Sequence, residues 1–179
     1  MKYFTKQRYL NPPKSEYPSL LKFILNRDKK SYEEMNACDE KATEQSRKMS
    51  DAYYEHYRQI EPQLPESILK FDPLHNPPYS MHDCLIVKSG FVNNDFYMDI
   101  DSSSGFCSVE KLTFINAEVL GNDSDNDLGV ATWLCNEIYL RGYKYEMQIL
   151  FWAKNNEIAE MSIAFDDIII EGNWETDDE

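Results

Sequence analysis

The stretch YKYEMQILFWAKNNEIAEMSIAF, residues 143–165, predicts two neighbouring β-strands and so decides the class of fold. In its first half every second side chain is apolar or aromatic: Tyr143, Tyr145, Met147, Ile149 and Phe151. Its second half repeats the alternation at Ala159, Met161, Ile163 and Phe165. A period of two is typical of a strand with one buried face. Asn155-Asn156 lies between the halves and has the chemistry of a hairpin turn.

The same alternation extends over residues 82–171 and predicts six strands, joined by turns rich in Gly, Asn and Asp. They cover residues 82–88, 95–101, 111–119, 132–141, 143–152 and 157–171. Residues 132–141 also have an apolar spacing that suits a helix, but a strand is favoured because both neighbours are strands and Gly142 follows. After Asp166-Asp167 the apolar positions switch parity to Ile168 and Ile170, which predicts a β-bulge.

The part before residue 81 has a different pattern. All eight prolines lie at or before Pro78, and all six glycines lie at or after Gly90. Helices are predicted over residues 6–10, 19–27 and 32–60, the last following a capping box formed by Ser31 and Glu34. Residues 61–80 form a proline-rich connector, with one helical turn expected after Pro65.

We therefore expect an α+β fold, in which N-terminal helices pack on a C-terminal antiparallel, mostly meander β-sheet of about six strands. Residues 1–80 form the helical part with its connector at 61–80, and residues 81–171 form the sheet. Residues 172–179 form an acidic tail. The connector is apolar enough to be pinned to the sheet, so we expect one folded unit.

The charge of the chain is concentrated in the sheet. Residues 1–70 hold 13 Lys and Arg against 11 Asp and Glu, whereas residues 71–179 hold 5 against 21. A field of this sign repels nucleic acid and anionic membranes and favours cationic partners, although solubility alone is the plainer explanation. We expect no nucleic-acid or membrane partner.

Cellular location is predicted from features that the chain lacks. No apolar run approaches the roughly 20 residues that a membrane span needs, and the opening MKYFTKQRYL has no apolar core typical of a secretory signal. The four cysteines are scattered without a CxxC pair: Cys38, Cys84, Cys107 and Cys135. This pattern argues against a zinc site and for reduced thiols in the cytoplasm.

His82-Asp83-Cys84 is the first candidate for chemistry. A His-Asp pair is found in metal-dependent phosphohydrolases, but those need further His and Asp ligands, and this chain has three histidines. In an extended segment His82 and Cys84 share a face about 7 Å apart, beyond direct hydrogen-bond reach. The plainer interpretation is that His82 and Asp83 satisfy backbone groups where the chain enters the sheet.

A second candidate is a loop that partly matches a calcium-binding loop. Asp99 and Asp101 precede Gly105, and Glu110 occupies the twelfth position. The glycine falls at the seventh position instead of the sixth, which breaks the match. The plainer interpretation is an acidic turn, so no metal or other cofactor is expected.

A third candidate is a binding surface on the sheet. Glu137, Glu146 and Glu160 are expected on the face of the last strands that points away from the core, flanked by Trp133 and Trp152. Neighbouring carboxylates serve acid–base chemistry, and they also suit an acidic interface. A solvated sheet face is the plainer alternative.

Several segments resemble a family of bacterial proteins known only as domain of unknown function 4085. They are MKYFTK at the start, MHDC (81–84), YMDIDSSSGF (97–106), WLCNEIYL (133–140), YKYEMQILFW (143–152) and MSIAFDDIIIE (161–171). After MKYFTK the chain continues QRYL, where the family pattern would have a Trp-Tyr pair. The resemblance implies a bacterial, intracellular protein and supplies no activity or catalytic residue.

Together these features predict a non-enzymatic cytoplasmic protein that binds a basic protein partner through an acidic sheet face, in the manner of an immunity or antagonist protein. One alternative is a hydrolase of unknown class that uses His82 and nearby cysteine and acidic residues. Another is a structural protein that forms a homodimer through the helix at 32–60.

Overall fold

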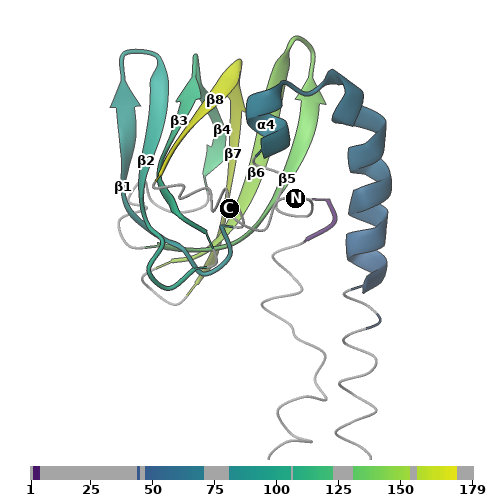
Figure 1. The fold of residues 1–179 in the computed structure, drawn as a ribbon, viewed down its shortest axis with the longest axis horizontal. Helices are drawn as coiled ribbons and strands as arrows, with labels where there is room; N and C mark the ends of the chain where they lie inside the picture. The colour runs from purple at the N-terminus through teal and green to yellow at the C-terminus, as the bar shows by residue number, and fades with distance from the viewer. Residues whose placement is uncertain are drawn as a thin grey trace, which may run out of the picture.

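The computed structural model describes residues 2–4, 44, 47–70, 81–105, 107–122, 131–153 and 157–172 (Figure 1). A helix over residues 47–60 leads into the 3-10 helix η1 (Glu61–Gln63) and the short helix α4 (Glu66–Lys70). Eight strands follow: β1 (Leu85–Val92), β2 (Asp95–Asp101), β3 (Val109–Ile115), β4 (Glu118–Asn122), β5 (Ala131–Arg141), β6 (Lys144–Trp152), β7 (Ile158–Phe165) and β8 (Asp167–Gly172). Several predictions fall on residues that the structure does not describe: the helices at 6–10 and 19–27, most of 32–46 with its capping box, the turn Asn155-Asn156, and the acidic tail after Gly172, which itself ends β8.

All eight strands belong to one antiparallel sheet, in the order β4-β7-β6-β5-β1-β2-β3-β8. The pairs β1–β2, β2–β3, β5–β6 and β6–β7 join consecutive strands, so the predicted antiparallel, mostly meander α+β fold is confirmed. The predicted number of six strands is wrong. Residues 111–119 and 157–171 each form two strands, because the chain bends at Asn116-Ala117 and at Asp166.

The two bends lie together and form one corner of the sheet. Asn116 has a positive φ of 48°, a conformation that Asn tolerates better than most residues. Its side-chain amide donates to Asp166 Oδ2 at 2.9 Å, and the Asp166 backbone N–H donates to the Ile115 carbonyl at 2.9 Å. The Lys144 ammonium donates to the Asn116 carbonyl and lies 3.4 Å from Asp166 Oδ1. The predicted parity switch after Asp166-Asp167 is thus a break between β7 and β8.

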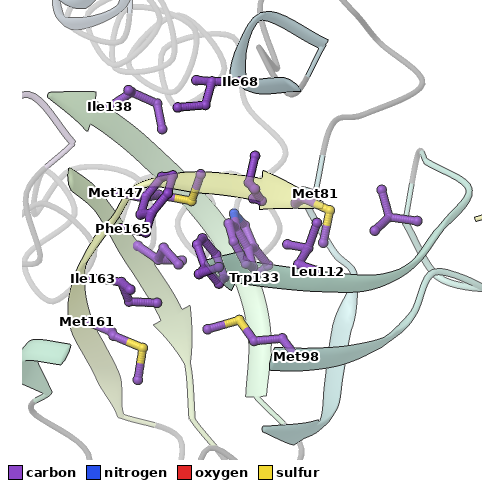
Figure 2. Packing of buried hydrophobic residues seen from close by; sticks show 14 of the residues in the cluster. Ile68, Met81, Met98, Leu112, Trp133, Ile138, Met147, Met161, Ile163 and Phe165 are labelled. Carbon is purple, nitrogen blue, oxygen red and sulfur yellow. The ribbon is translucent and has the colours of Figure 1, made fainter. Parts of the chain in front are cut away.

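The concave side of the curved sheet encloses the main core. Figure 2 shows Trp133 in its middle, with Met147 and Phe165 on one side and Met98 and Leu112 on the other, and all five are buried. The Trp133 ring meets Phe151 edge-on at 5.6 Å between centroids. The buried and half-buried side chains alternate along β2, as the pattern Phe96, Met98, Ile100 predicts.

The helices in the described ranges do not form a layer over one face of the sheet, which corrects the predicted packing. The helix over 47–60 stands beside β5, and α4 lies near the start of β8 (Figure 1). β1 pairs with only two residues of β5, so the rest of that β5 edge is free for the helix. There Ile138 N–H donates to the Tyr53 hydroxyl at 2.8 Å, and the Ile138 carbonyl lies 3.2 Å from His56 Nε2, which must be the donor. These contacts satisfy backbone groups that an open edge would expose.

Two local predictions are settled by the strands. Residues 131–141 form β5, so the preference for a strand over a helix is confirmed. The first strand was predicted at 82–88 but runs from Leu85 to Val92, with Gly90 inside it. The turn between β1 and β2 contains Asn93, which has a positive φ of 57°. Gly90 lies across from Tyr97, and a Cβ at this position would be in ordinary contact with the Tyr97 ring at 3.5 Å.

Candidate functional site

Glu137, predicted to lie on an exposed acidic face, is fully buried. Its carboxylate accepts backbone N–H groups from Lys2 at 2.8 Å, Tyr3 at 2.8 Å and Phe4 at 2.5 Å. It also accepts the Tyr139 hydroxyl, whose pKa is raised by burial and by this bond to a carboxylate. The expectation of an exposed binding residue is therefore wrong for Glu137, because the N-terminal segment covers it.

Glu146 is also buried, and its carboxylate accepts three side-chain hydrogen bonds. Its oxygens accept the Ser162 hydroxyl at 2.6 Å, the Gln148 amide at 2.7 Å and the Arg141 guanidinium at 3.1 Å. Burial acts to raise the pKa of Glu146, but these hydrogen bonds and the charge of Arg141 outweigh it and hold the pKa below its usual value. A carboxylate with three donors is a structural group that is poorly placed to contact a partner.

The other predicted binding residues are divided between surface and core. Trp133 is fully buried, so its predicted place beside a surface patch is wrong. Trp152 is 50% exposed, and Glu160 is partly exposed on β7 opposite Leu150. Nearby, Leu134, Leu150 and Ile158 form a second, smaller buried cluster. Of the five predicted residues, only Glu160 and Trp152 lie where a partner could contact them directly.

A different part of the sheet carries an open acidic surface, which we call the β2 face. It is the outward side of β1, β2, β3 and β8, and α4 reaches it at one edge, where the Ser67 hydroxyl donates to Asp167 Oδ1 (Figure 1). Cross-strand pairing aligns Tyr97 with Thr113 and Ile169 in one row, and Lys88, Asp99, Lys111 and Glu171 in the next. Its five acids and two lysines give it three net negative charges: Asp95, Asp99, Asp101, Asp167, Glu171, Lys88 and Lys111.

The centre of the β2 face is aromatic and apolar. Ile169 is 50% exposed, and the Tyr97 ring has the ammonium groups of Lys88 and Lys111 each 5.7 Å from its centroid. Sequence reasoning placed Asp99 and Asp101 in a candidate metal loop and missed this surface. The alternation of Asp95, Tyr97, Asp99 and Asp101 along one strand was the signal that could have found it.

The candidate catalytic residues form a tight turn before β1. His82 is exposed and its Nδ1 lies 3.0 Å from Asp83 Oδ2. Asp83 has a positive φ of 67°, and its N–H donates to the Trp133 carbonyl at 2.9 Å. Cys84 is fully buried, and its hydrogen bond to Cys107, together with burial, raises the pKa of its thiol. A buried, protonated thiol is a poor nucleophile, so the geometry does not favour the hydrolase alternative.

The structure also brings together two cysteines that sequence reasoning left apart. Cys84 Sγ lies 3.3 Å from Cys107 Sγ, and Cys107 Sγ lies 3.8 Å from the Met81 thioether. Cys107 is half-buried in the loop between β2 and β3. In a meander β1 and β3 start at the same end of the sheet, so residues just before each strand are neighbours. That topology was the signal available in the sequence.

The candidate calcium loop does not gather its carboxylates. Asp99 points outward from β2 opposite Lys111. Asp101 Oδ1 accepts the Ser103 N–H at 2.9 Å, and hydrogen bonds from Ser103 lower the Asp101 pKa. Glu110 is exposed at the start of β3. Within the described part of the chain, no group of three or more His, Cys, Asp or Glu side chains could hold a metal ion.

Comparison with known proteins identifies the family. The family model described as "Protein of unknown function (DUF4085)" matches residues 9–163, and the chain belongs to that family. No curated protein and no solved structure matches it. Among the helices in the described ranges, none has the length and apolar character to cross a membrane.

Proposed function

We propose that this protein is a non-catalytic, cytoplasmic binding module that contacts a basic protein partner through the β2 face. The observation that carries the proposal is the composition of this face. Its apolar and aromatic row lies between a row that alternates lysines with acids and the acids Asp95 and Asp167. Aromatic and apolar centres with charged rims are common at protein interfaces. An immunity-like or antagonist role is one concrete form of such binding.

Charge supports a basic partner over a neutral one. The chain carries a net charge of −14, and the β2 face itself is net acidic. Acidic surfaces attract cationic partners at long range and repel anionic ones. Glu137 and Glu146, which the sequence predicted as binding residues, are buried inside the fold. Asp95 and Asp101 lie on the solvent-facing side of β2.

Three matched lysine substitutions separate the possible surfaces. Ile169→Lys tests the β2 face, Trp152→Lys tests the face predicted from the sequence, and Tyr143→Lys is the control in the β5–β6 turn, where Tyr143 is 91% exposed. Each adds one positive charge at an exposed apolar residue. Partners are captured from a lysate of the source cells, identified, purified and then titrated against all four proteins.

The proposal predicts that Ile169→Lys weakens binding of the purified partner by about tenfold or more, the scale of a central interface residue. Tyr143→Lys should leave binding unchanged, and raising the salt concentration should weaken it. If Trp152→Lys alone is defective, the partner uses the other face. If no variant and no salt concentration affects binding, the proposal fails.

The geometry gives less support to the two alternatives, a hydrolase and a homodimeric structural protein. The hydrolase would need an accessible nucleophile, and Cys84 is buried. Dimerisation through the 32–60 helix remains a prediction for which the structure offers no support. In the described part of that helix, Tyr53, Tyr57 and Ile60 are buried in the chain's own core.

A further inference from the structure

Cys84 and Cys107 are arranged as a reactive pair. Their sulfur atoms lie 3.3 Å apart, whereas a disulfide needs about 2.05 Å. The required approach of the two sulfur atoms is therefore about 1.3 Å. Both thiols are free.

The two thiols differ in the way that an attacking and a resolving cysteine differ. Cys107 keeps part of its surface exposed, whereas Cys84 is fully buried and contacts it through the two sulfur atoms. The hydrogen bond from Cys84 lowers the pKa of Cys107 to about 7, against the effect of burial and with help from the Val109 N–H. Thiolates, and not thiols, attack disulfides.

The surrounding loop is shaped around the buried thiol. A Cβ added at Gly105 would lie 2.3 Å from Cys84 Sγ and 3.2 Å from the Cys84 backbone nitrogen. Only glycine lets the loop before Cys107 rest on the turn that carries Cys84. The Gly105 N–H donates to the Ser102 carbonyl at 2.9 Å, which fixes the turn of this loop.

We propose that Cys84 and Cys107 form a thiol–disulfide exchange site whose substrates are small-molecule disulfides. The Cys107 thiolate attacks one sulfur of the substrate RSSR, which forms a Cys107–SR mixed disulfide and releases RS⁻. The released RS⁻ takes the proton of Cys84, and the Cys84 thiolate then attacks the Cys107 sulfur, which forms the Cys84–Cys107 disulfide and releases the second RS⁻. The protein is oxidised by two electrons, and one substrate disulfide is reduced to two thiols.

The test uses the full chain and oxidised glutathione as the probe, in buffer with a chelator to prevent metal-catalysed oxidation. Free thiols are alkylated after the reaction, and disulfides are located by peptide mass spectrometry. The expected product is a monomer with one disulfide between Cys84 and Cys107, and with Cys38 and Cys135 still reduced. Cys135→Ser is the matched control and should react like the wild type.

Two further variants separate the roles of the thiols. Cys84→Ala should accumulate the glutathione adduct on Cys107, because the resolving thiol is absent, whereas Cys107→Ser should leave Cys84 unmodified. Near-ultraviolet circular dichroism checks their folding, and if Cys84→Ala does not fold, the wild type and Cys107→Ser decide. The proposal is overturned by a stable adduct on wild-type Cys107, by a disulfide through Cys38 or Cys135, or by a chain that stays reduced.

Discussion

Replacing Glu137 by glutamine tests whether this buried carboxylate holds the N-terminal segment on the sheet. The wild-type carboxylate accepts three backbone N–H groups and one hydroxyl. In Glu137→Gln one oxygen becomes an NH₂ group. The Tyr139 hydroxyl can reverse and accept from it, but the Lys2 N–H on the same side loses its acceptor. The bonds from Tyr3 and Phe4 become neutral bonds.

The magnitude follows from this bond inventory. Hydrogen bonds to charged groups contribute about 1.5–3 kcal/mol each and neutral ones about 0.5–1.5 kcal/mol. One lost and two weakened bonds, offset by the easier burial of an amide, give a loss of about 3 kcal/mol in the free energy of unfolding. For a domain of this size the melting temperature should fall by about 6–12 °C.

Thermal and urea unfolding measure this loss, and amide hydrogen exchange shows where it acts. The amides of Tyr3 and Phe4 should exchange faster in Glu137→Gln, while those of β2 keep their relative order of protection. The control Glu55→Gln changes an exposed glutamate on the helix and should stay within about 0.5 kcal/mol of the wild type. A Glu137→Gln protein that melts with the wild type and keeps its N-terminal protection would refute the reasoning.

Three other predictions concern the corner, the polar network and the thiols. Asn116→Val should lower the free energy of unfolding by about 2 kcal/mol and Asn116→Gly by about 1 kcal/mol, as measured by urea denaturation. Both variants lose the side-chain hydrogen bond to Asp166, but only valine is also strained by the positive φ. Equal losses would contradict this reasoning. The folded pKa of Glu146 is lowered, so its contribution to stability is present above its usual pKa and disappears as the pH falls through the folded value. The stability gap between the wild type and Glu146→Gln should therefore shrink from about pH 6 to about pH 3, and a gap that widens would exclude the network. The rate of Cys107 alkylation by iodoacetamide should reach half its maximum at about pH 7. Cys84→Ala removes the hydrogen bond that lowers the Cys107 pKa, so it should move this midpoint to higher pH. An unchanged midpoint would show that the two thiols do not interact.

Period-two alternation was enough to predict most of the sheet. It placed β2, β5, β6 and β7, and it placed the buried positions along β2 and β7, because burial on one face acts directly on successive side chains. It failed at Trp133 and Glu137, which are buried, and at Tyr143, which is 91% exposed. It predicted a β-bulge from the parity switch at Asp166, where the structure has a break between two strands, and it missed the bend at Asn116. It also missed that the sheet encloses its own core, because curvature depends on which distant strands pair, as in β3–β8 and β4–β7.

The candidate sites were less predictable for the same reason. Whether an outward glutamate is exposed depends on the segment that lies over it, and Glu137 is covered by residues 2–4, more than 130 positions away. The Cys84–Cys107 pair likewise depends on two loops meeting at one end of the sheet. Short-range patterns carry no information about such contacts.

The acidic residues of this protein fall into two groups, and the number of donors that reach each carboxylate separates them. Glu137 and Glu146 each accept several hydrogen bonds within the fold, so substituting them should change stability first. Asp99 and Glu171 lie on the outward side of the sheet beside Lys88 and Lys111, so substituting them should change binding first. Net charge alone cannot distinguish these groups. A scan that measures unfolding and partner binding on the same variants would separate them, because the two readouts should respond to different glutamates and aspartates.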